Sequence, residues 1–240
     1  MKILKIMKNQ SFILLVLLFG FMLIGCEAKK EKDTWGLSDE ELSLVLTGVI
    51  LNTNYNDLLD GTILDKQAGL IWSKCSQGQV YRKAENDCRG KVSGSLYTPN
   101  DQILWGASTY AYCNTNTWAC NSKSIPLSLV ENAGFITTGY SEAFNSCNSL
   151  NNANGFPGWR VPTNLELVKL TIGGRIALMQ YFPDTVENLY WSSWSKQDDQ
   201  TGEKAIAVNF DRQKFGEEQN IDKIGKSYLR CIRPSVPVSR

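Results

Sequence analysis

Six cysteines between residues 75 and 231 constrain the fold of this chain more than any other feature. A seventh cysteine, Cys26, lies apart from them near the N-terminus. None of the seven stands in a CxxC spacing and the chain has no histidine, so a metal site explains them poorly. The even set predicts disulfide bridges. Its members are Cys75, Cys88, Cys113, Cys120, Cys147 and Cys231.

The N-terminal segment predicts export from the cytoplasm. Residues 1–8 contain three lysines, residues 12–24 form an apolar stretch, and small Gly25 precedes Cys26. This arrangement resembles the lipobox of bacterial lipoproteins, which implies removal of residues 1–25 as a signal peptide and acylation of Cys26. An uncleaved helical anchor and an ordinary secretory signal are the alternatives. Because two or more acyl chains anchor a protein stably, we expect attachment to the bacterial envelope, in the outer membrane and exposed at the surface.

Export makes disulfides the expected state of the remaining cysteines, because thiols in an oxidising compartment form pairs. Six cysteines can pair in about 15 ways, and the sequence by itself leaves these open. Short loops favour pairing the first four with their neighbours along the chain, which leaves the last two to close a long loop. The pairs favoured in this way are Cys75–Cys88, Cys113–Cys120 and Cys147–Cys231.

Charge argues against a general attraction to polyanions. Without the three lysines of residues 1–25, the chain keeps 22 of its 25 basic residues against 24 acidic ones, a net charge near −2. No overall basic field results, so we expect no nucleic-acid partner. Binding of a sulfated glycan would require a local basic patch. The length that remains suits one good-sized domain.

Two short segments precede that domain. Residues 26–34 are charged and predict a flexible, acylated tether. A capping-box pattern at Ser38–Glu41, followed by apolar residues at helical spacing, predicts a helix within residues 35–59. We expect this helix to pack on the domain; as an alternative it contacts a partner or a second copy. The main domain is then residues 60–240, with a cysteine-containing insertion at about 89–139.

The main domain has the pattern of an α+β fold with an antiparallel sheet and two helices. The segments Thr62–Asp65 and Leu70–Trp72 predict a hairpin. Ser141 predicts the start of one helix, and the capping box Thr163–Glu166 predicts a second that ends near Leu170. The residues from Cys75 to Gly139 show little periodicity and predict long loops held by disulfides. Further strands are expected at Tyr190–Trp194, Ala205–Phe210 and Tyr228–Ile232.

Six motifs between Asp60 and Pro234 occur in the order seen in the Lcl C-terminal domain family, which this chain resembles. The resemblance implies a C-type-lectin-like fold, in which a long bridge typically joins an early helix to the last strand, as Cys147–Cys231 would. The family is named after a bacterial collagen-like adhesin, whose domain is associated with sulfated glycosaminoglycans and cell attachment. This chain lacks the collagen-like repeats. The motifs are DGTILDKQAGLIWSKCSQG, EAFNSC, GWRVPTNLEL, YFPDT, YWSSWS and LRCIRP.

The motif around Trp159 and Arg160 also looks like the RLPT-type segment of formylglycine-generating enzymes. In that comparison Arg160 and Glu166 occupy framework positions, so we expect Glu166 to form the capping box with Thr163 and to pair with the arginine. The lack of histidine excludes Ser-His-Asp and Cys-His catalysis. A glycosidase needs only two carboxylates, but the acidic residues at 198, 199, 203, 217 and 218 fall in stretches typical of solvated loops. We expect no enzymatic activity, no cofactor and no metal.

Aromatic and amide side chains are the candidates for ligand contact. A cluster in the insertion is similar in composition to recognition loops, and Trp194 is placed to stack on a sugar ring if it is exposed. The alternative is that these residues only cover the sheet. The loop Asp198–Glu203 offers oxygen ligands for calcium, although it is also typical of a hairpin turn. The cluster consists of Tyr110, Tyr112, Asn114, Asn116 and Trp118.

These observations together favour a surface adhesin that binds a host extracellular-matrix protein or glycan. The competing hypothesis is a structural envelope lipoprotein that assembles with bacterial partners. The two differ in where the domain must be, because an adhesin has to be accessible on intact cells.

Overall fold

The computed structural model describes the greater part of the chain after residue 53. The chain divides into two units, Met1–Leu46 and Thr47–Arg240, and the described residues all belong to the second. Cys26, the tether and the helix expected after Ser38 lie outside them. Across the described part, no helix combines the length and the apolar character needed to cross a membrane. The described residues are 54–98, 104–117, 120, 140–153, 156–196 and 201–235.

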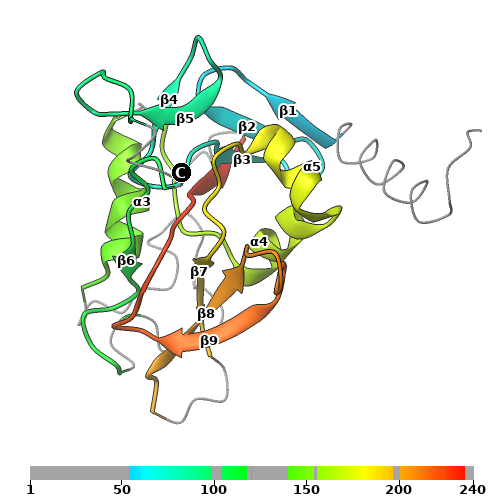
Figure 1. Ribbon diagram of the computed structural model, residues 1–240. Coiled ribbons are helices and arrows are strands. Elements are labelled where there is room, and N and C mark those ends of the chain that lie inside the picture. The colour runs from blue at the N-terminus through cyan, green and yellow to red at the C-terminus, as the bar shows by residue number, and fades with distance from the viewer. Residues whose placement is uncertain are drawn as a thin grey trace, which may run out of the picture. The chain divides into compact units, whose positions relative to one another are not determined.

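The described chain forms three helices and several antiparallel sheets (Figure 1). The helices are α3 (Glu142–Ala153), α4 (Asn164–Thr171) and α5 (Gly174–Tyr181). The strands are β1 (Tyr55–Asp57), β2 (Thr62–Asp65), β3 (Leu70–Ser73), β4 (Val80–Arg82), β5 (Asp87–Gly90), β6 (Tyr110–Ala111), β7 (Leu189–Ser195), β8 (Lys204–Asn209), β9 (Glu218–Asp222), β10 (Lys226–Ser227) and β11 (Ile232–Pro234).

The α+β class agrees with the prediction, but the count of two helices was wrong. Helix α5 follows α4 after only Ile172 and Gly173, and both Gly173 and Gly174, the first residue of α5, have positive φ. These glycines interrupt the helical pattern, and no side chain caps the start of α5. The usual signs of a helix N-terminus are therefore absent from the sequence at this point.

A four-stranded sheet in the order β1-β2-β3-β11 contains the predicted hairpin. Its register pairs Thr62 with Ser73 and Asp65 with Leu70. Strand β1 adds to β2 along one edge, so Tyr55–Asp57, at the end of the segment within which a helix is expected, form a strand. On the other edge, β11 pairs Ile232 with Trp72. The first and last described strands therefore close the two edges of one sheet.

A three-stranded sheet, β7-β8-β9, is the second large sheet. Strands β7 and β8 lie close to their predicted positions, whereas β9 was expected to be a loop. The side chains of β9 are alternately exposed and half-buried, and most are polar, so the strand carries no apolar signal. Glu218 accordingly belongs to a strand rather than to a solvated loop.

The strand predicted at Tyr228–Ile232 is only partly correct. Tyr228 donates its N–H to the carbonyl of Leu189 at 2.9 Å, beside the three-stranded sheet. Three residues later the carbonyl of Cys231 accepts from Ser73 N–H at 2.9 Å, beside the four-stranded sheet. The segment changes partner between sheets, so its regular strand begins only at Ile232.

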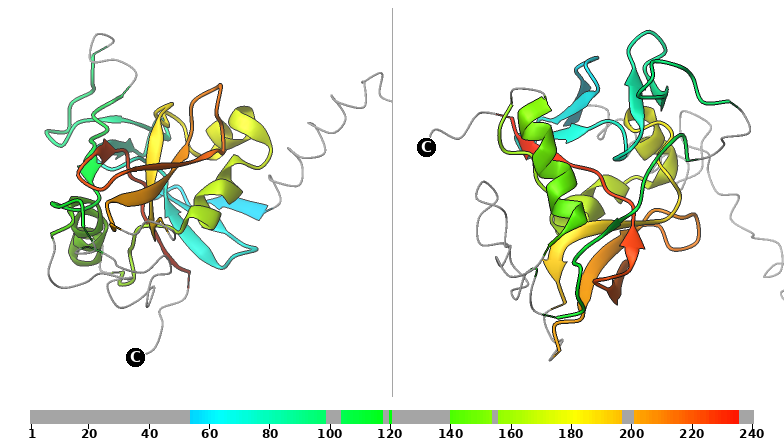
Figure 2. Two further views of the ribbon diagram at one scale, coloured as in Figure 1. Left: turned by 90° about the horizontal axis from the view of Figure 1, so that it is seen from below. Right: turned by 90° about the vertical axis from the view of Figure 1, so that its left-hand side faces the viewer.

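Strand β7 separates two hydrophobic cores because successive side chains point to opposite faces. Trp191 belongs to a core with α3, Phe144 and the disulfide of Cys147. Tyr190 belongs to a core that contains residues of α4 and α5. Figures 1 and 2 show α3 on one side of the sheets and α4 and α5 on the other.

Both predicted helix starts are present. The hydroxyl of Ser141 accepts from Phe144 N–H at 3.3 Å at the start of α3. At the start of α4, the hydroxyl of Thr163 accepts from Glu166 N–H at 3.2 Å, and the Glu166 carboxylate accepts from Thr163 N–H at 2.7 Å. This reciprocal pair is the capping box that the sequence predicted.

Three disulfides join the described cysteines, and their pairing is the one that short loops favoured. Cys75–Cys88 and Cys113–Cys120 close separations of 13 and 7 residues, and Cys147–Cys231 closes 84. The last bridge ties α3 to the residue before β11. Since disulfides persist in oxidising compartments, the domain is an extracytoplasmic one.

Candidate functional site

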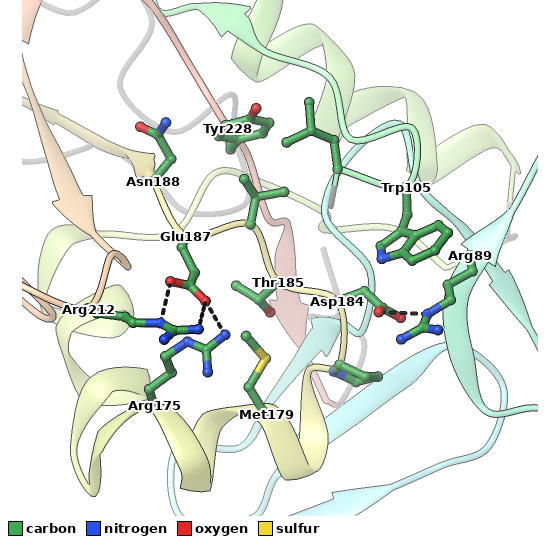
Figure 3. Close-up of a pocket in the computed structure, with 13 residues that line it drawn as sticks. Arg89, Trp105, Arg175, Met179, Asp184, Thr185, Glu187, Asn188, Arg212 and Tyr228 are labelled. Carbon is green, nitrogen blue, oxygen red and sulfur yellow. Dashed lines mark hydrogen bonds and ion pairs between the residues drawn. The ribbon is translucent and has the colours of Figure 1, made fainter. Parts of the chain in front are cut away.

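A hollow of about 710 Å³ opens beside α5 and the loop that follows it (Figure 3). The β4–β5 hairpin and the segment around Trp105 form the opposite wall. We call this pocket the arginine hollow, after the guanidinium groups around it. Its charged and aromatic members used below are Arg89, Trp105, Arg175, Asp184, Glu187 and Arg212.

Two arginines share one carboxylate on the α5 side of the hollow. Arg212 donates from Nε to Glu187 Oε2 at 3.0 Å, and Arg175 donates from Nη2 to Oε1 of the same residue. The side chain of Arg212 is 73% exposed, and that of Arg175 is about one-third exposed. Ion pairs this exposed to water contribute little to stability. An incoming anion can therefore contact these guanidinium groups at small cost to the fold.

The opposite wall holds a third arginine in a fixed position. Arg89 donates from Nε to Asp184 Oδ1 at 2.9 Å, and its guanidinium carbon lies 4.5 Å from the centre of the Trp105 ring. The second oxygen of Asp184 accepts from the N–H of Cys88 at 3.2 Å. Asp184 is 5% exposed, so this carboxylate supports the wall and only its arginine faces the solvent.

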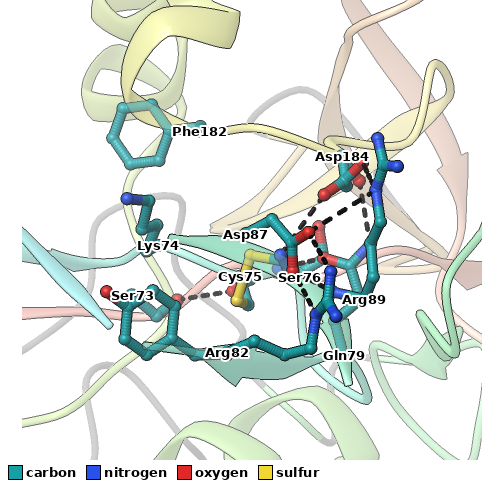
Figure 4. Close-up of a disulfide and its surroundings, with 12 residues drawn as sticks. Ser73, Lys74, Cys75, Ser76, Gln79, Arg82, Asp87, Arg89, Phe182 and Asp184 are labelled. Atoms are coloured by element: carbon teal, nitrogen blue, oxygen red, sulfur yellow. Dashed lines mark hydrogen bonds and ion pairs between the residues drawn. A yellow bond between two sulfur atoms is a disulfide. The ribbon is translucent and has the colours of Figure 1, made fainter. Parts of the chain in front are cut away.

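Gln79 connects the two loops that bear this wall. Its amide nitrogen donates to the carbonyl of Leu104 at 3.0 Å and to that of Asp184 at 2.8 Å. Its amide oxygen accepts from Ser76 N–H at 2.9 Å. One side chain thus fixes the spacing between Trp105, which follows Leu104, and the loop after α5. Figure 4 shows Gln79 beside Asp184, Arg89 and the Cys75–Cys88 disulfide.

Arg230 supports the loop after α5 from beneath. It is fully buried, donates to Thr185 Oγ1 at 2.8 Å and to the carbonyl of Ser73 at 2.9 Å, and lies over the Phe182 ring. Burial lowers the pKa of Arg230, while the neighbouring Tyr190 acts in the opposite direction. Arg230 belongs to the LRCIRP motif, so that motif anchors the floor of the hollow.

The charge of the hollow favours an anion. Three guanidinium groups face two carboxylates, and Arg212 has most of its surface free to water. Guanidinium groups bind carboxylate, sulfate or phosphate through paired hydrogen bonds, and Trp105 adds a flat apolar wall. Within the described ranges, no group of three or more acidic or cysteine side chains is arranged to hold a metal ion.

The residues predicted for ligand contact do not form one surface. Tyr112 is fully buried, stacks edge-on against Trp191 and donates to the carbonyl of Ser193 at 2.8 Å, so its expected place on a surface is corrected to the core. Tyr110 is half-buried and lines a second hollow of about 410 Å³ with Tyr140. Trp118 lies outside the described residues.

The two asparagines of the predicted cluster hold loops together. Asn114 accepts from Tyr140 N–H at 3.1 Å through its side-chain oxygen. Asn116 accepts from Ile224 N–H at 2.9 Å, in the turn between β9 and β10. Their amide oxygens therefore have partners within the domain. Asn114 is nevertheless exposed and remains accessible at the surface.

Trp194 is half-buried, whereas Trp191 on the same strand is completely buried. Trp194 therefore lacks the full exposure on which its expected stacking against a sugar ring depends. Tyr110 lies beside Trp191, whose indole N–H donates to the Tyr110 carbonyl at 2.7 Å. In the loop expected as a hairpin turn or calcium site, residues 198–200 are not described.

The motif around Arg160 has the geometry of a framework element. Arg160 is buried and forms two parallel hydrogen bonds to Glu166, at 2.8 and 2.7 Å. Burial by itself would raise the pKa of Glu166, but the hydrogen bonds and charge of Arg160, with those from Thr163, outweigh it and hold the pKa below its usual value. Trp159 is buried beside this pair, under the guanidinium of Arg233.

The sequence profile of the Lcl C-terminal domain family matches residues 61–233. The chain belongs to this family. The Lcl C-terminal domain therefore spans the described sheets from β2 to β11 and contains the whole arginine hollow, the three disulfides and the Arg160–Glu166 pair. No curated protein matches the chain.

Sequence reasoning missed the arginine hollow because its members are spread along the chain. Arg89, Arg175 and Arg212 lie in three separate segments that are otherwise mixed in charge. The weak signal available was the YFPDT motif, which contains Asp184 and leads into Glu187. The motif that identifies the Lcl domain thus contributes a supporting carboxylate to the hollow.

Proposed function

We propose that this protein is a lipid-anchored surface adhesin whose Lcl domain, of C-type-lectin-like fold, binds a host extracellular-matrix protein or glycan. The arginine hollow is the observation that carries this proposal. Family membership and the three disulfides support a domain that works outside the cytoplasm. The lipobox-like segment ending at Cys26 supports the anchor, and the outer membrane is the proposed location.

The ligand group that best fits the hollow is an anion on a larger molecule. A sulfate or carboxylate placed between Arg175 and Arg212 would share them with Glu187, and Arg89 would approach it from the other wall. Trp105 would contact the adjoining sugar ring or side chain. Because part of this attraction acts through water, affinity should fall as the salt concentration rises.

We propose binding without catalysis. Both carboxylates of the hollow, Asp184 and Glu187, are paired with arginines. The oxygens of Glu187 accept from two arginines, and those of Asp184 accept from Arg89 and the Cys88 N–H, so both carboxylates are engaged within the domain. The pairs thus fit a framework for ligand contact better than acid–base chemistry.

The test is binding of the detergent-purified chain to immobilised laminin, fibronectin, collagen and heparin over a range of salt concentrations, with and without EDTA. We expect saturable binding that weakens with salt and that Arg212→Glu reduces at least about tenfold. Lys83→Glu is the matched control, because Lys83 is exposed outside the hollow and the substitution changes the charge equally.

Binding that Arg212→Glu leaves unchanged would remove the hollow from the proposal. No saturable binding, together with protection of the domain from protease on intact cells, would instead favour a structural lipoprotein facing the periplasm. Loss of binding in EDTA would point to calcium rather than to the arginines.

A further inference from the structure

The most unusual group outside the arginine hollow is a buried lysine at the junction of three strands. Lys74 directly follows β3, and its side chain is 1% exposed. Its amino group meets Asp57, at the end of β1, and Asn86, in the turn between β4 and β5. Burying a charged ammonium group is costly unless its partners compensate fully. The arrangement therefore needs an explanation beyond a surface ion pair.

The contacts bring a nucleophile, an electrophile and a proton carrier together. Lys74 Nζ lies 2.5 Å from Asp57 Oδ2 and also contacts Asn86 Oδ1. Asn86 Nδ2 donates to the same Asp57 oxygen at 2.9 Å. Tyr81 donates its hydroxyl to Asn86 Oδ1 at 2.8 Å. The Asp57 oxygen thus touches both the amine and the amide nitrogen, while Tyr81 polarises the carbonyl between them.

We propose that Lys74 and Asn86 become joined by an intramolecular isopeptide bond, with Asp57 as the proton carrier. An ordinary ion pair would account for Lys74 and Asp57 alone. The Asn86 carboxamide adds a carbonyl group, and its oxygen contacts the amine while its nitrogen contacts the carboxylate. Reacting groups held in this way react as though at very high local concentration.

Each step of the reaction has a group in place. Asp57 takes a proton from the Lys74 ammonium, and the free amine attacks Cγ of Asn86. The Tyr81 hydroxyl stabilises the oxyanion that develops on Oδ1. Asp57 then delivers the proton to Nδ2, and the Cγ–Nδ2 bond breaks to release ammonia. Asp57 takes the second proton from the lysine nitrogen, which becomes the neutral N–H of the new amide, and the ammonia carries this proton away as ammonium. One amine and one primary amide become one secondary amide and one ammonia, so no oxidant or other reactant is needed.

The environment of Asp57 keeps this carboxyl group ionised and open to solvent. Burial would raise its pKa, but hydrogen bonds from Lys74 and Asn86 outweigh burial and keep the pKa below its usual value. At neutral pH the group is therefore a carboxylate that can accept a proton. Asp57 is about one-fifth exposed, so water can reach it and the ammonia can escape.

The bond would duplicate a covalent link that already exists nearby. Lys74 precedes Cys75 (Figure 4), and Asn86 lies two residues before Cys88, the disulfide partner of Cys75. An amide bond is not reduced by thiols, whereas the disulfide is. If the disulfide were reduced, the isopeptide bond would still link the β4–β5 hairpin, and with it Arg89 of the hollow, to the end of β3.

Peptide mapping of the full chain tests the proposal directly. The protein, purified from membranes of an expressing bacterium, is reduced, alkylated and digested with a protease that cuts after lysine. We expect a branched peptide that contains Lys74 uncleaved and joined to the peptide of Asn86, lighter than the two together by one ammonia. Only linear peptides, with cleavage after Lys74, would overturn the proposal.

Two variants separate the chemistry from the fold. Asp57→Asn keeps the size of the side chain and should slow bond formation at least about 100-fold, because the proton carrier is lost. Asp60→Asn, in the turn after β1, is the matched control and should form the bond at the normal rate. Asn86→Gly tolerates the positive φ at this position, with no strain, and should abolish the branched peptide. A branched peptide of normal yield in Asp57→Asn would refute the role of Asp57.

Discussion

The disulfide between Cys147 and Cys231 should stabilise the domain far more than the one between Cys113 and Cys120. The first closes a separation of 84 residues and the second only 7, although both have a Cα–Cα distance of 5.5 Å. All four cysteines are completely buried. Replacing each pair with alanine therefore makes matched variants that differ mainly in the size of the loop that is opened.

The expected difference follows from the entropy of the unfolded chain. Restricting a loop in that chain stabilises the folded state by about 4.6 kcal/mol for the long bridge and about 2.4 kcal/mol for the short one. Losses of packing are similar in the two variants, because each removes two buried sulfur atoms. The Cys147→Ala/Cys231→Ala variant should thus be less stable than Cys113→Ala/Cys120→Ala by about 2 kcal/mol.

Urea unfolding followed by tryptophan fluorescence measures this difference, and the chain has seven tryptophans. Linear extrapolation gives the free energy of unfolding of each variant, and the slope shows whether the unfolded state has changed in compactness. If the short-bridge variant loses as much stability as the long-bridge variant, or more, restriction of the unfolded chain is not the main source of stabilisation. Strain or residual structure would then have to explain the result.

Three further predictions concern other parts of the fold. Glu166→Gln should lower the free energy of unfolding in urea by about 3 kcal/mol, because it leaves the buried Arg160 without a counter-charge. Leu165→Gln, at an exposed neighbouring position, should change the free energy of unfolding by less than about 0.5 kcal/mol. The folded-state pKa of Glu166 lies below its ordinary value of 4.5, so the stability that Glu166 contributes should be present above that pH and lost as the pH falls through the folded pKa. If the free energy of unfolding of Glu166→Gln falls as steeply with acid as that of the unchanged protein, this expectation is contradicted. Gly78→Ala should lower the stability measured by thermal unfolding by about 1–3 kcal/mol more than Gly94→Ala does. Both glycines have positive φ, but only at Gly78 would the new Cβ meet a carbonyl oxygen, that of Gly106 at 2.5 Å. Equal losses of stability would show that the backbone conformation alone sets the effect.

Local signals predicted the elements that have caps or alternating apolar residues. Thr163 and Glu166 satisfy each other's backbone groups within four residues, so the sequence contains the whole interaction. The hairpin of β2 and β3 is equally local. Strand β9 and helix α5 escaped prediction because their stability comes from neighbours far along the chain: β9 is a polar strand that pairs with β8, and α5 packs through Ala177 and Leu178.

The candidate site was predicted less well than the fold, for a related reason. Tyr112 and Asn114 have the composition of a recognition loop, but composition does not show which side a side chain faces. The structure turns Tyr112 into the core and uses the amide oxygen of Asn114 to hold Tyr140. The arginine hollow depends on Gln79, whose partners lie 25 and 105 residues away. No local pattern reports such distances.

The edge position of β11 sets a limit on when this domain can finish folding. Synthesis delivers a chain from its N-terminus, so Ile232 and its neighbours become available after all the other described strands. Until they do, the sheet edge at β3 is open, Cys147 has no partner, and the cavity beneath Thr185 lacks the Arg230 side chain that fills it. A domain of this topology stays incompletely folded until β11 is available, because one sheet edge, one disulfide and one buried arginine all depend on residues 230–234.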